Sequence, residues 1–345
     1  MQKVTRLFLS PLLKGVDQLL VWIAHLRSPI KKEGFFESPP EEKAENRLPR
    51  SPREIFPPPE GEPDFRVLST RAYRGVKTAR IAFPTPEPSG FPENDGAIAY
   101  FTENTVKKNR AAAVFVHPWM SKSLALDHSW CRDFARNGVD SIALILPYHM
   151  ERSPEGSFSG EFTLRGDPSA ISGKFKQAVS EIQLLYFYLR RHYRSVGIIG
   201  LSLGAYVAHI GMLVQPFDFG ISLLAGAPLA DMFHHSIYTR RYRKLLMKSG
   251  ISLTKLEKAW YGSDPVTWGP FNRAKKILMI NALYDRVVPP DLTEKLREAF
   301  GRPEIIWYPC AHFSLPLFYR SVRKKMFAFI FDQKTPSRTH SCTKI

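Results

Sequence analysis

From about residue 65 onward, short apolar runs alternate with longer segments in which apolar residues recur at helical spacing. Runs of strand length occupy residues 65–68, 78–83, 97–101, 112–116, 141–146, 196–199, 219–224, 277–281 and 305–308. The periodicity between them predicts helices over residues 124–136, 172–192, 203–213, 291–300 and 315–331. This alternation predicts an α/β fold: a mostly parallel sheet with helices on both faces and an antiparallel edge formed by the first strands.

The first 27 residues carry an apolar stripe that predicts an amphipathic N-terminal helix over residues 1–27. Lys14, Asp17 and Gln18 interrupt the stripe, so it is short and polar for a membrane-spanning helix, and no small-residue cleavage site of a secretory signal follows it. Two interpretations stay open: the helix lies in a membrane interface with Trp22 at headgroup depth, or it packs on the body of the domain. A true membrane span is a third alternative.

Nine prolines lie within residues 28–63, three of them in succession at Pro57, Pro58 and Pro59. Proline lacks a backbone donor and cannot continue a helix, so this segment is expected to be an extended linker. The folded domain is then expected over residues 64–332, followed by a C-terminal tail at 333–345.

Charge and cysteine usage narrow the classes of partner. Three cysteines among 345 residues, without a CxxC pair, indicate neither a disulfide framework nor a zinc site, and they favour a reducing, cytoplasmic location. The net charge of +17 is concentrated in residues 1–32, 226–274 and 320–345, which carry +5, +5 and +6. Any attraction to an anionic membrane surface would belong to these segments. No zinc finger, RNP pattern or basic helix-turn-helix is present, so no nucleic-acid partner is expected.

One serine stands between two glycines where an apolar run ends, in the sequence Gly200-Leu201-Ser202-Leu203-Gly204. The preceding run reads as a buried strand and the following one as a helix, which places Ser202 on the turn between them. A strained turn of this kind exposes the serine hydroxyl, and small residues two positions to either side let the strand and the helix approach. The pattern predicts a nucleophile elbow.

A serine hydroxyl is a weak nucleophile that needs a neighbouring base, itself oriented by an acid. His312 follows the last predicted strand, and Asp285 follows the strand before it. Functional residues gather at the carboxyl ends of such strands, so Ser202, Asp285 and His312 are expected to form a catalytic triad that needs no metal or other cofactor. Asp231, after an earlier strand, is the alternative acid, and Cys310 is the alternative nucleophile beside His312.

The chain resembles the α/β-hydrolase superfamily over residues 65–331, through the segments GLSLG, ALYDRVVP and AHFS. Ala311 replaces the glycine usual before the histidine of that superfamily. The resemblance implies a mostly parallel eight-stranded sheet, a helical lid at about residues 226–274, and Ser202 as nucleophile, His312 as base and Asp285 as acid. The segment LPYHMERSP resembles, more loosely, the branch that includes alpha/beta hydrolase domain-containing protein 18.

A tetrahedral intermediate requires backbone N–H donors aimed at its oxyanion. Leu203 is the first expected donor. The second should come from the loop after the segment AAAVFV, where Pro118 has no N–H and Trp119 is therefore the expected donor. Alternatively, Trp119 lines an acyl pocket or packs under the lid. His117 and Met120 flank this position and are expected to contact the substrate.

Two further segments are expected near the site. The loop at residues 147–170 follows the strand next to the elbow strand, with Tyr148 and Arg152 as candidate substrate contacts; a surface loop without contact is the alternative. Residues 238–244 of the lid mix aromatic and cationic side chains, which suits a lipid headgroup or a phosphate, or simply a solvated helix face.

Together these features predict a serine hydrolase that cleaves an ester or thioester, lipophilic in character, through an acyl-enzyme. The expected substrate is a small-molecule ester or a lipid, and the expected location is cytoplasmic and peripheral to a membrane. Two alternatives remain: a catalytically inert binding protein on the same fold, and a basic nucleic-acid-binding protein.

Overall fold

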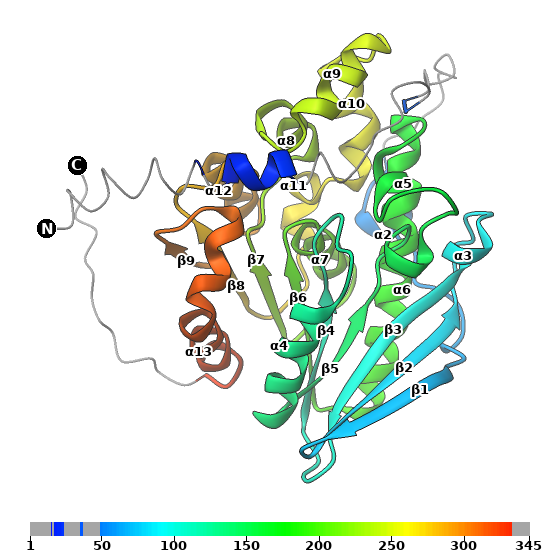
Figure 1. The fold of residues 1–345 in the computed structure, drawn as a ribbon, viewed down its shortest axis with the longest axis vertical. Coiled ribbons are helices and arrows are strands. Elements are labelled where there is room, and N and C mark those ends of the chain that lie inside the picture. Colours follow the sequence, from blue (N-terminus) through cyan, green and yellow to red (C-terminus); the bar gives the residue numbers. More distant parts are fainter. Residues whose placement is uncertain (1–14, 16, 24–34, 37–48, 333–345) are drawn as a thin grey trace, which may run out of the picture.

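The computed structural model describes residues 15, 17–23, 35–36 and 49–332, and a nine-stranded sheet runs through this part of the chain (Figure 1). The strands are β1 (Arg66–Tyr73), β2 (Val76–Pro84), β3 (Gly96–Asn104), β4 (Ala111–Val116), β5 (Val139–Leu144), β6 (Ser195–Leu201), β7 (Phe219–Leu223), β8 (Ile277–Ala282) and β9 (Glu304–Tyr308). Their spatial order is β1-β2-β3-β5-β4-β6-β7-β8-β9.

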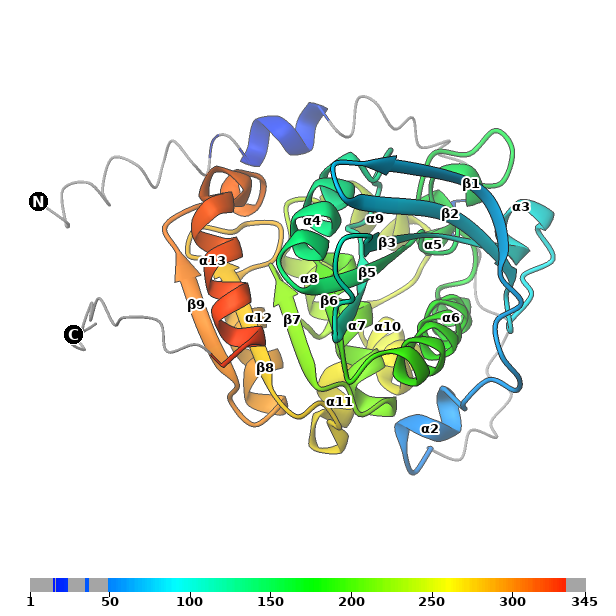
Figure 2. The same ribbon diagram turned by 90° about the horizontal axis from the view of Figure 1, so that it is seen from below.

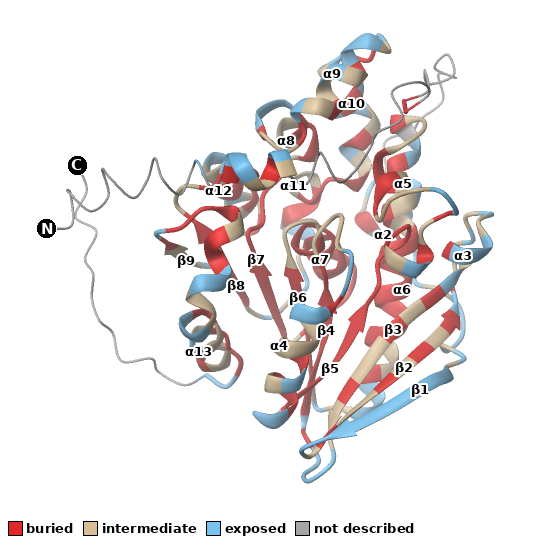
Figure 3. Ribbon diagram, in the orientation of Figure 1, coloured by how far each residue is buried: buried red, intermediate tan, exposed pale blue. Residues whose placement is uncertain are grey.

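The sheet is parallel from β5 through β9 and antiparallel along β1, β2, β3 and β5. This confirms the α/β class and the antiparallel edge, but the sheet has nine strands rather than the eight that the resemblance implied. The outermost strand, β1, forms a hairpin with β2 through Arg74 and Gly75, whose φ angles of 48° and 74° suit a tight two-residue turn. All of β1 is exposed, as Figure 3 shows.

Helices cover both faces of the sheet (Figure 2). On one face lie α6 (Ile171–His192), α7 (Leu203–Val214) and α12 (Pro290–Ala299); on the other lie α4 (Ala125–Arg136) and α13 (Tyr319–Ile330). Side chains of a strand alternate between faces, so in the fully buried β4 Val114 packs under α6 and α7 while Phe115 packs under α4 and α13. Two apolar layers therefore hold the central strands, and they fix the positions of the strand ends.

The segment between β7 and β8 forms α8 (Leu229–His235), α9 (Arg240–Lys248), α10 (Leu253–Trp260) and α11 (Pro265–Trp268). Helices α8, α9 and α10 lie beyond the carboxyl ends of the central strands (Figure 1), and α11 packs against α7 and α12. Fully buried Tyr242 and Trp260 anchor this helical insertion. The remaining short elements are α2 (Pro52–Ile55), α3 (Pro92–Asp95), α5 (Glu161–Leu164), η1 (Met150–Arg152), η2 (Pro168–Ala170), η3 (Tyr261–Ser263), η4 (Gly269–Phe271) and η5 (His312–Phe318).

Parts of the N-terminal region pack on this body. Residues 17–23 are helical, and Val21 lies buried against Val287 and Val288. Buried Phe35 contacts the ring of Tyr242, with ring centroids 5.3 Å apart. Apart from Gly15, the other residues of the predicted helix at 1–27, most of the predicted linker, and the tail at 333–345 lie outside the described residues. Within the described part of the chain, no helix is long and apolar enough to cross a membrane.

Candidate active site

Ser202 occupies the turn between β6 and α7 in a conformation that non-glycine residues rarely adopt. Its φ and ψ angles are 53° and −115°, and its N–H donates to the carbonyl of Leu223 at 2.9 Å. A Cβ on Gly200 would lie 2.3 Å from the carbonyl oxygen of Gly204, and a Cβ on Gly204 would lie 2.1 Å from that of Val116. The two glycines therefore allow the close approach that holds this strained serine in place.

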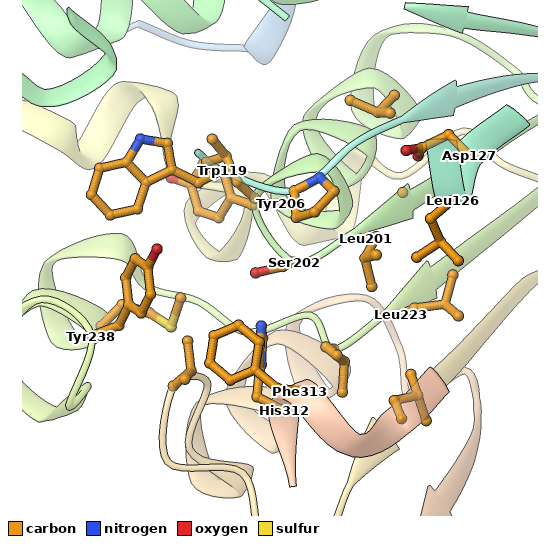
Figure 4. A pocket seen from close by; sticks show the side chains of 18 of the residues that line it. Trp119, Leu126, Asp127, Leu201, Ser202, Tyr206, Leu223, Tyr238, His312 and Phe313 are labelled. Carbon is orange, nitrogen blue, oxygen red and sulfur yellow. The ribbon is translucent and has the colours of Figure 1, made fainter. Parts of the chain in front are cut away.

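Asp285 and His312 meet at the same edge of the sheet, from the loops after β8 and β9. Nδ1 of His312 lies 2.8 Å from Oδ2 of Asp285, and both side chains are buried. The other carboxylate oxygen of Asp285 accepts the N–H groups of Val287 and Val288, at 2.8 and 2.7 Å. The acid is thus fixed on both oxygens, and it orients the imidazole. Figure 4 shows the ring of His312 directed toward the hydroxyl of Ser202.

The charge around His312 favours its protonated form. Burial lowers the pKa of His312, but the charge and hydrogen bond of Asp285, together with the charge of Asp17, outweigh burial and raise that pKa above its ordinary value of 6.5. A base of raised pKa accepts a proton readily from an attacking hydroxyl.

Asp17, in the N-terminal helical segment, was missed as a site residue by sequence reasoning. Its carboxylate accepts the backbone N–H of His312 at 3.0 Å and that of Phe313 at 3.1 Å, and its side chain is fully buried. The one feature of the sequence that marks this position is that Asp17 is a charged residue inside an apolar helical stripe.

The alternative residues named from the sequence lie in other environments. Asp231 pairs with Nζ of Lys295 at 2.6 Å, on α8. Cys310 is fully buried, and burial raises the pKa of its thiol to about 12. That thiol therefore stays protonated at neutral pH and is a poor nucleophile.

A pocket of about 320 Å³ adjoins Ser202, and its walls are mainly apolar. Lining side chains come from the loop after β4, from α4, from α7, from the insertion and from η5, and they include Trp119, Leu126, Tyr206, Leu223, Tyr238 and Phe313 (Figure 4). Asp127, in the first turn of α4, is the one carboxylate among the described residues that line this pocket, and burial raises its pKa to about 6. The sequence offered no sign of this position, because an acid in the first turn of a helix is ordinary.

The two expected oxyanion donors, Leu203 at the start of α7 and Trp119 in the loop after β4, lie beside this pocket. Leu203 is the first residue of α7, so its N–H has no acceptor within the helix. Trp119 lines the pocket, its indole donates to the carbonyl of Gly160 at 2.8 Å, and its ring packs against Tyr238 of the insertion. Met120, with φ of 60°, accepts the hydroxyl of Tyr238 on its sulfur at 3.1 Å. Trp119 thus lines the pocket and packs against the insertion, as the alternative to the donor role had it, while its role as an oxyanion donor stays a prediction.

Three of the four expected substrate contacts are buried within the protein. His117 accepts the N–H of Leu146 on Nε2 at 3.0 Å, and burial lowers its pKa to about 4, so it is a neutral structural group. Tyr148 packs against Phe162, with ring centroids 6.1 Å apart. Neither residue lines the pocket.

Arg152 is fully buried, and the prediction that it contacts substrate is wrong. Its guanidinium forms a two-pronged ion pair with Glu181 of α6, with both N–O distances 2.7 Å, and it donates to the carbonyls of Ile145 and Asn94. All its donor atoms are used inside the protein, so Arg152 ties the loop after β5 to α6. Met120, the fourth expected contact, is not among the residues that line the pocket. Its sulfur accepts the hydroxyl of Tyr238, which does line the pocket.

A family model and several known proteins match parts of this chain. A serine hydrolase (FSH1) family model matches residues 155–317, slightly less than half of the chain and a segment that contains Ser202, Asp285 and His312. Two uncharacterized proteins of Mycobacterium tuberculosis, from strains CDC 1551 / Oshkosh and ATCC 25618 / H37Rv, are each 28% identical over 188 residues, or 51% of this chain. The match covers 42% of the length of either relative.

Several solved structures share the fold at low sequence identity. The acetyl xylan esterase from Paenibacillus sp. R4 is 14% identical with a TM-score of 0.63, over 81% of this chain and 92% of that one. Acetyl xylan esterase 1 from Thermoanaerobacterium sp. JW/SL YS485 is 15% identical with a TM-score of 0.58, over 77% and 88%. The acylaminoacyl peptidase of Pyrococcus horikoshii is 15% identical with a TM-score of 0.52, over 79% of this chain and 49% of that one. The sheet topology and these similarities show that the chain has the α/β-hydrolase fold.

Proposed function

We propose that this protein is a serine hydrolase that cleaves a carboxylic ester or thioester with an apolar acyl group. One observation carries the proposal: the imidazole that contacts Asp285 is directed toward Ser202 at the edge of an apolar pocket. The match to a serine hydrolase family model over these residues supports the same reaction class.

In the proposed first half-reaction, Oγ of Ser202 attacks the carbonyl carbon of the substrate while Nε2 of His312 takes the hydroxyl proton. Asp285 accepts a hydrogen bond from Nδ1 and stabilises the imidazolium that forms. The N–H groups of Leu203 and Trp119 would bind the oxyanion. The intermediate then expels the alcohol or thiol, which leaves with the proton from His312, and an ester between the acyl group and Ser202 remains.

In the second half-reaction, His312 takes a proton from water, whose oxygen attacks the acyl carbon. The second tetrahedral intermediate collapses and releases the acid, while the proton returns to Oγ of Ser202. The same oxyanion donors serve both steps, so the loop that carries Trp119 must keep its place throughout.

The walls of the pocket support an apolar acyl group. Leu126, Leu223, Phe313 and the ring of Trp119 offer an apolar surface, and burial of each methylene of an acyl chain there contributes about 0.8 kcal/mol. The fold alone does not choose between ester and peptide substrates, since the similar structures include both esterases and a peptidase. The lining is the reason for favouring a lipophilic ester.

A peripheral membrane contact is part of the proposal. In the helical segment 17–23, Leu19 and Trp22 are 55% and 58% exposed, while Asp17 and Val21 face the body. A bilayer surface with anionic headgroups would cover these two apolar side chains, and it would attract the basic N-terminal residues.

The test is covalent labelling by a fluorophosphonate probe. Wild type should be labelled, Ser202→Ala should not, and His312→Ala should react far more slowly, because the hydroxyl then lacks its base. Ser123→Ala and His192→Ala remove the same kinds of side chain at exposed positions and should label like wild type. Labelling of Ser202→Ala, or a folded wild type that stays unlabelled, would contradict the proposal and favour an inert binding protein.

A further inference from the structure

The short helix that carries His312 receives part of its N-terminal cap from the other end of the chain. Helix η5 begins at His312, and the first N–H groups of any helix lack acceptors within the helix. Oγ of Ser314 accepts the N–H of Ala311 at 2.9 Å. The next two N–H groups, those of His312 and Phe313, are both accepted by the carboxylate of Asp17.

The same N-terminal segment also contacts the loop of the acid. Val21 lies one helical turn after Asp17 and packs against Val287 and Val288. The N–H groups of those two valines are the ones that Asp285 accepts. Residues 17–23 therefore bridge the two loops that bring Asp285 and His312 together.

Burial of Asp17 needs an explanation, because a carboxylate without solvent is costly unless hydrogen bonds compensate it. Burial raises the pKa of Asp17 although the N–H groups of Phe313 and His312 act to lower it. An apolar residue at this position would pack in the helical stripe, but it would leave two buried N–H groups without an acceptor. The two backbone N–H groups that Asp17 accepts therefore explain why a carboxylate is buried at this position.

We propose that Asp17 is a positioning residue for the hydrolytic reaction: by binding the N–H groups of His312 and Phe313, it holds the imidazole against Asp285 and in line with Ser202, so that hydrolysis requires the N-terminal segment to be docked. This inference rests on the proposed function for its catalytic part. The contact itself stands on the geometry of the described residues.

Asp17 also acts on His312 through its charge. The groups whose charges act on Asp17 are Asp285 and His312, and the thiol of Cys310 also feels its charge. The carboxylate of Asp17 favours the imidazolium form of His312, which is the form that develops in the transition state. Removal of this charge lowers the pKa of His312 even if Asp17 only caps the helix. The labelling rate at a pH where His312 is neutral in both proteins therefore separates the two roles, because a merely structural cap leaves that rate unchanged.

The experiment uses the full chain and the variant Asp17→Asn, which keeps the size of the side chain but removes its charge and faces an amide donor toward one of the N–H groups. Gln18→Ala, at the exposed neighbouring position, is the matched control. We measure the rate constant of fluorophosphonate labelling against pH, the NMR titration of the His312 ring, and amide hydrogen exchange at His312 and Phe313.

In Asp17→Asn, labelling should slow by roughly ten- to a hundredfold, because small displacements of reacting groups cost this much. His312 should titrate at lower pH, the labelling rate should begin to rise at lower pH, and Gln18→Ala should match wild type. Wild-type labelling of Asp17→Asn at a pH well above the pKa of its His312 would overturn the inference. If that variant does not fold, amide exchange in wild type decides: protected N–H groups support the contact, and freely exchanging ones refute it.

Failure of the proposed function would look different. A folded wild type that is never labelled argues against hydrolysis, and the His312 titration and the amide exchange still report whether Asp17 holds the loop.

Discussion

Gly204→Ala should change the geometry of the elbow while it leaves the nucleophile, Ser202, in the chain. The new Cβ would lie 2.1 Å from the carbonyl oxygen of Val116 and 2.6 Å from that of His117, whereas Cβ atoms essentially never come within 3.0 Å of such atoms. Helix α7 and the end of β4 must therefore move apart by roughly 1 Å, a misplacement that costs about a hundredfold in rate when it separates reacting groups.

The moved segments carry both expected oxyanion donors, Leu203 on the helix and Trp119 on the loop after β4. We therefore expect kcat to fall by about a hundredfold while KM changes less, since the donors act on the oxyanion rather than on the bound ester. Overpacking of the core should also lower the free energy of unfolding by about 1–3 kcal/mol. The assay is hydrolysis of p-nitrophenyl esters, with urea denaturation on the same samples.

Gly173→Ala is the matched control, because a Cβ on Gly173, within α6, would meet nothing within 4 Å. It should keep wild-type kcat and gain up to about 1 kcal/mol of stability from helix propensity. If Gly204→Ala is folded and hydrolyses esters at the wild-type rate, then close packing of the elbow does not set the positions of the donors, and the reasoning fails.

Three further predictions concern burial, protonation and the membrane. Arg152→Met leaves the buried carboxylate of Glu181 without its cation, so the free energy of unfolding by urea should fall by about 3–5 kcal/mol. KM should stay at the wild-type value. A raised KM at unchanged stability would instead indicate that Arg152 contacts the substrate. Although burial opposes it, the carboxylates near His312 raise its pKa above 6.5, and since only the neutral ring accepts a proton, kcat/KM should rise with pH along a limb with its midpoint above 6.5. A midpoint below 6.5 would show that burial prevails. Leu19→Ser combined with Trp22→Ala should reduce flotation with anionic vesicles, because both side chains are exposed, and equal flotation would argue against the membrane contact.

The fold and the meeting of Asp285 with His312 could be predicted because both depend on local patterns. Strand-length apolar runs locate the sheet, and residues just after parallel strands gather at one edge, whatever lies between them in sequence. The Gly-x-Ser-x-Gly segment likewise carries its own steric reason, visible in the contacts that a Cβ at Gly200 or Gly204 would make.

Arg152 and Asp17 could not be assigned in this way, because their partners are distant in the chain. A charged residue in a loop beside the site resembles a substrate contact, and only the structure shows that Glu181, on the helix predicted at residues 172–192, neutralises Arg152. Asp17 is separated from His312 by 295 residues, and no spacing rule connects a polar interruption of a helical stripe with a backbone N–H at the other end.

The contacts of Trp119 couple the position of the helical insertion to the position of the loop that carries an expected oxyanion donor. Its indole is bound to the loop at Gly160, its ring rests on Tyr238, and the neighbouring Met120 holds the hydroxyl of that tyrosine. An outward movement of α8 and the segment after it must break the contacts with Tyr238, and it thereby frees the loop whose N–H would bind the oxyanion. Under the proposed function, such a coupling would make an open site a slow catalyst, and the closed form would be the one in which an acyl-enzyme is both formed and shielded from competing nucleophiles.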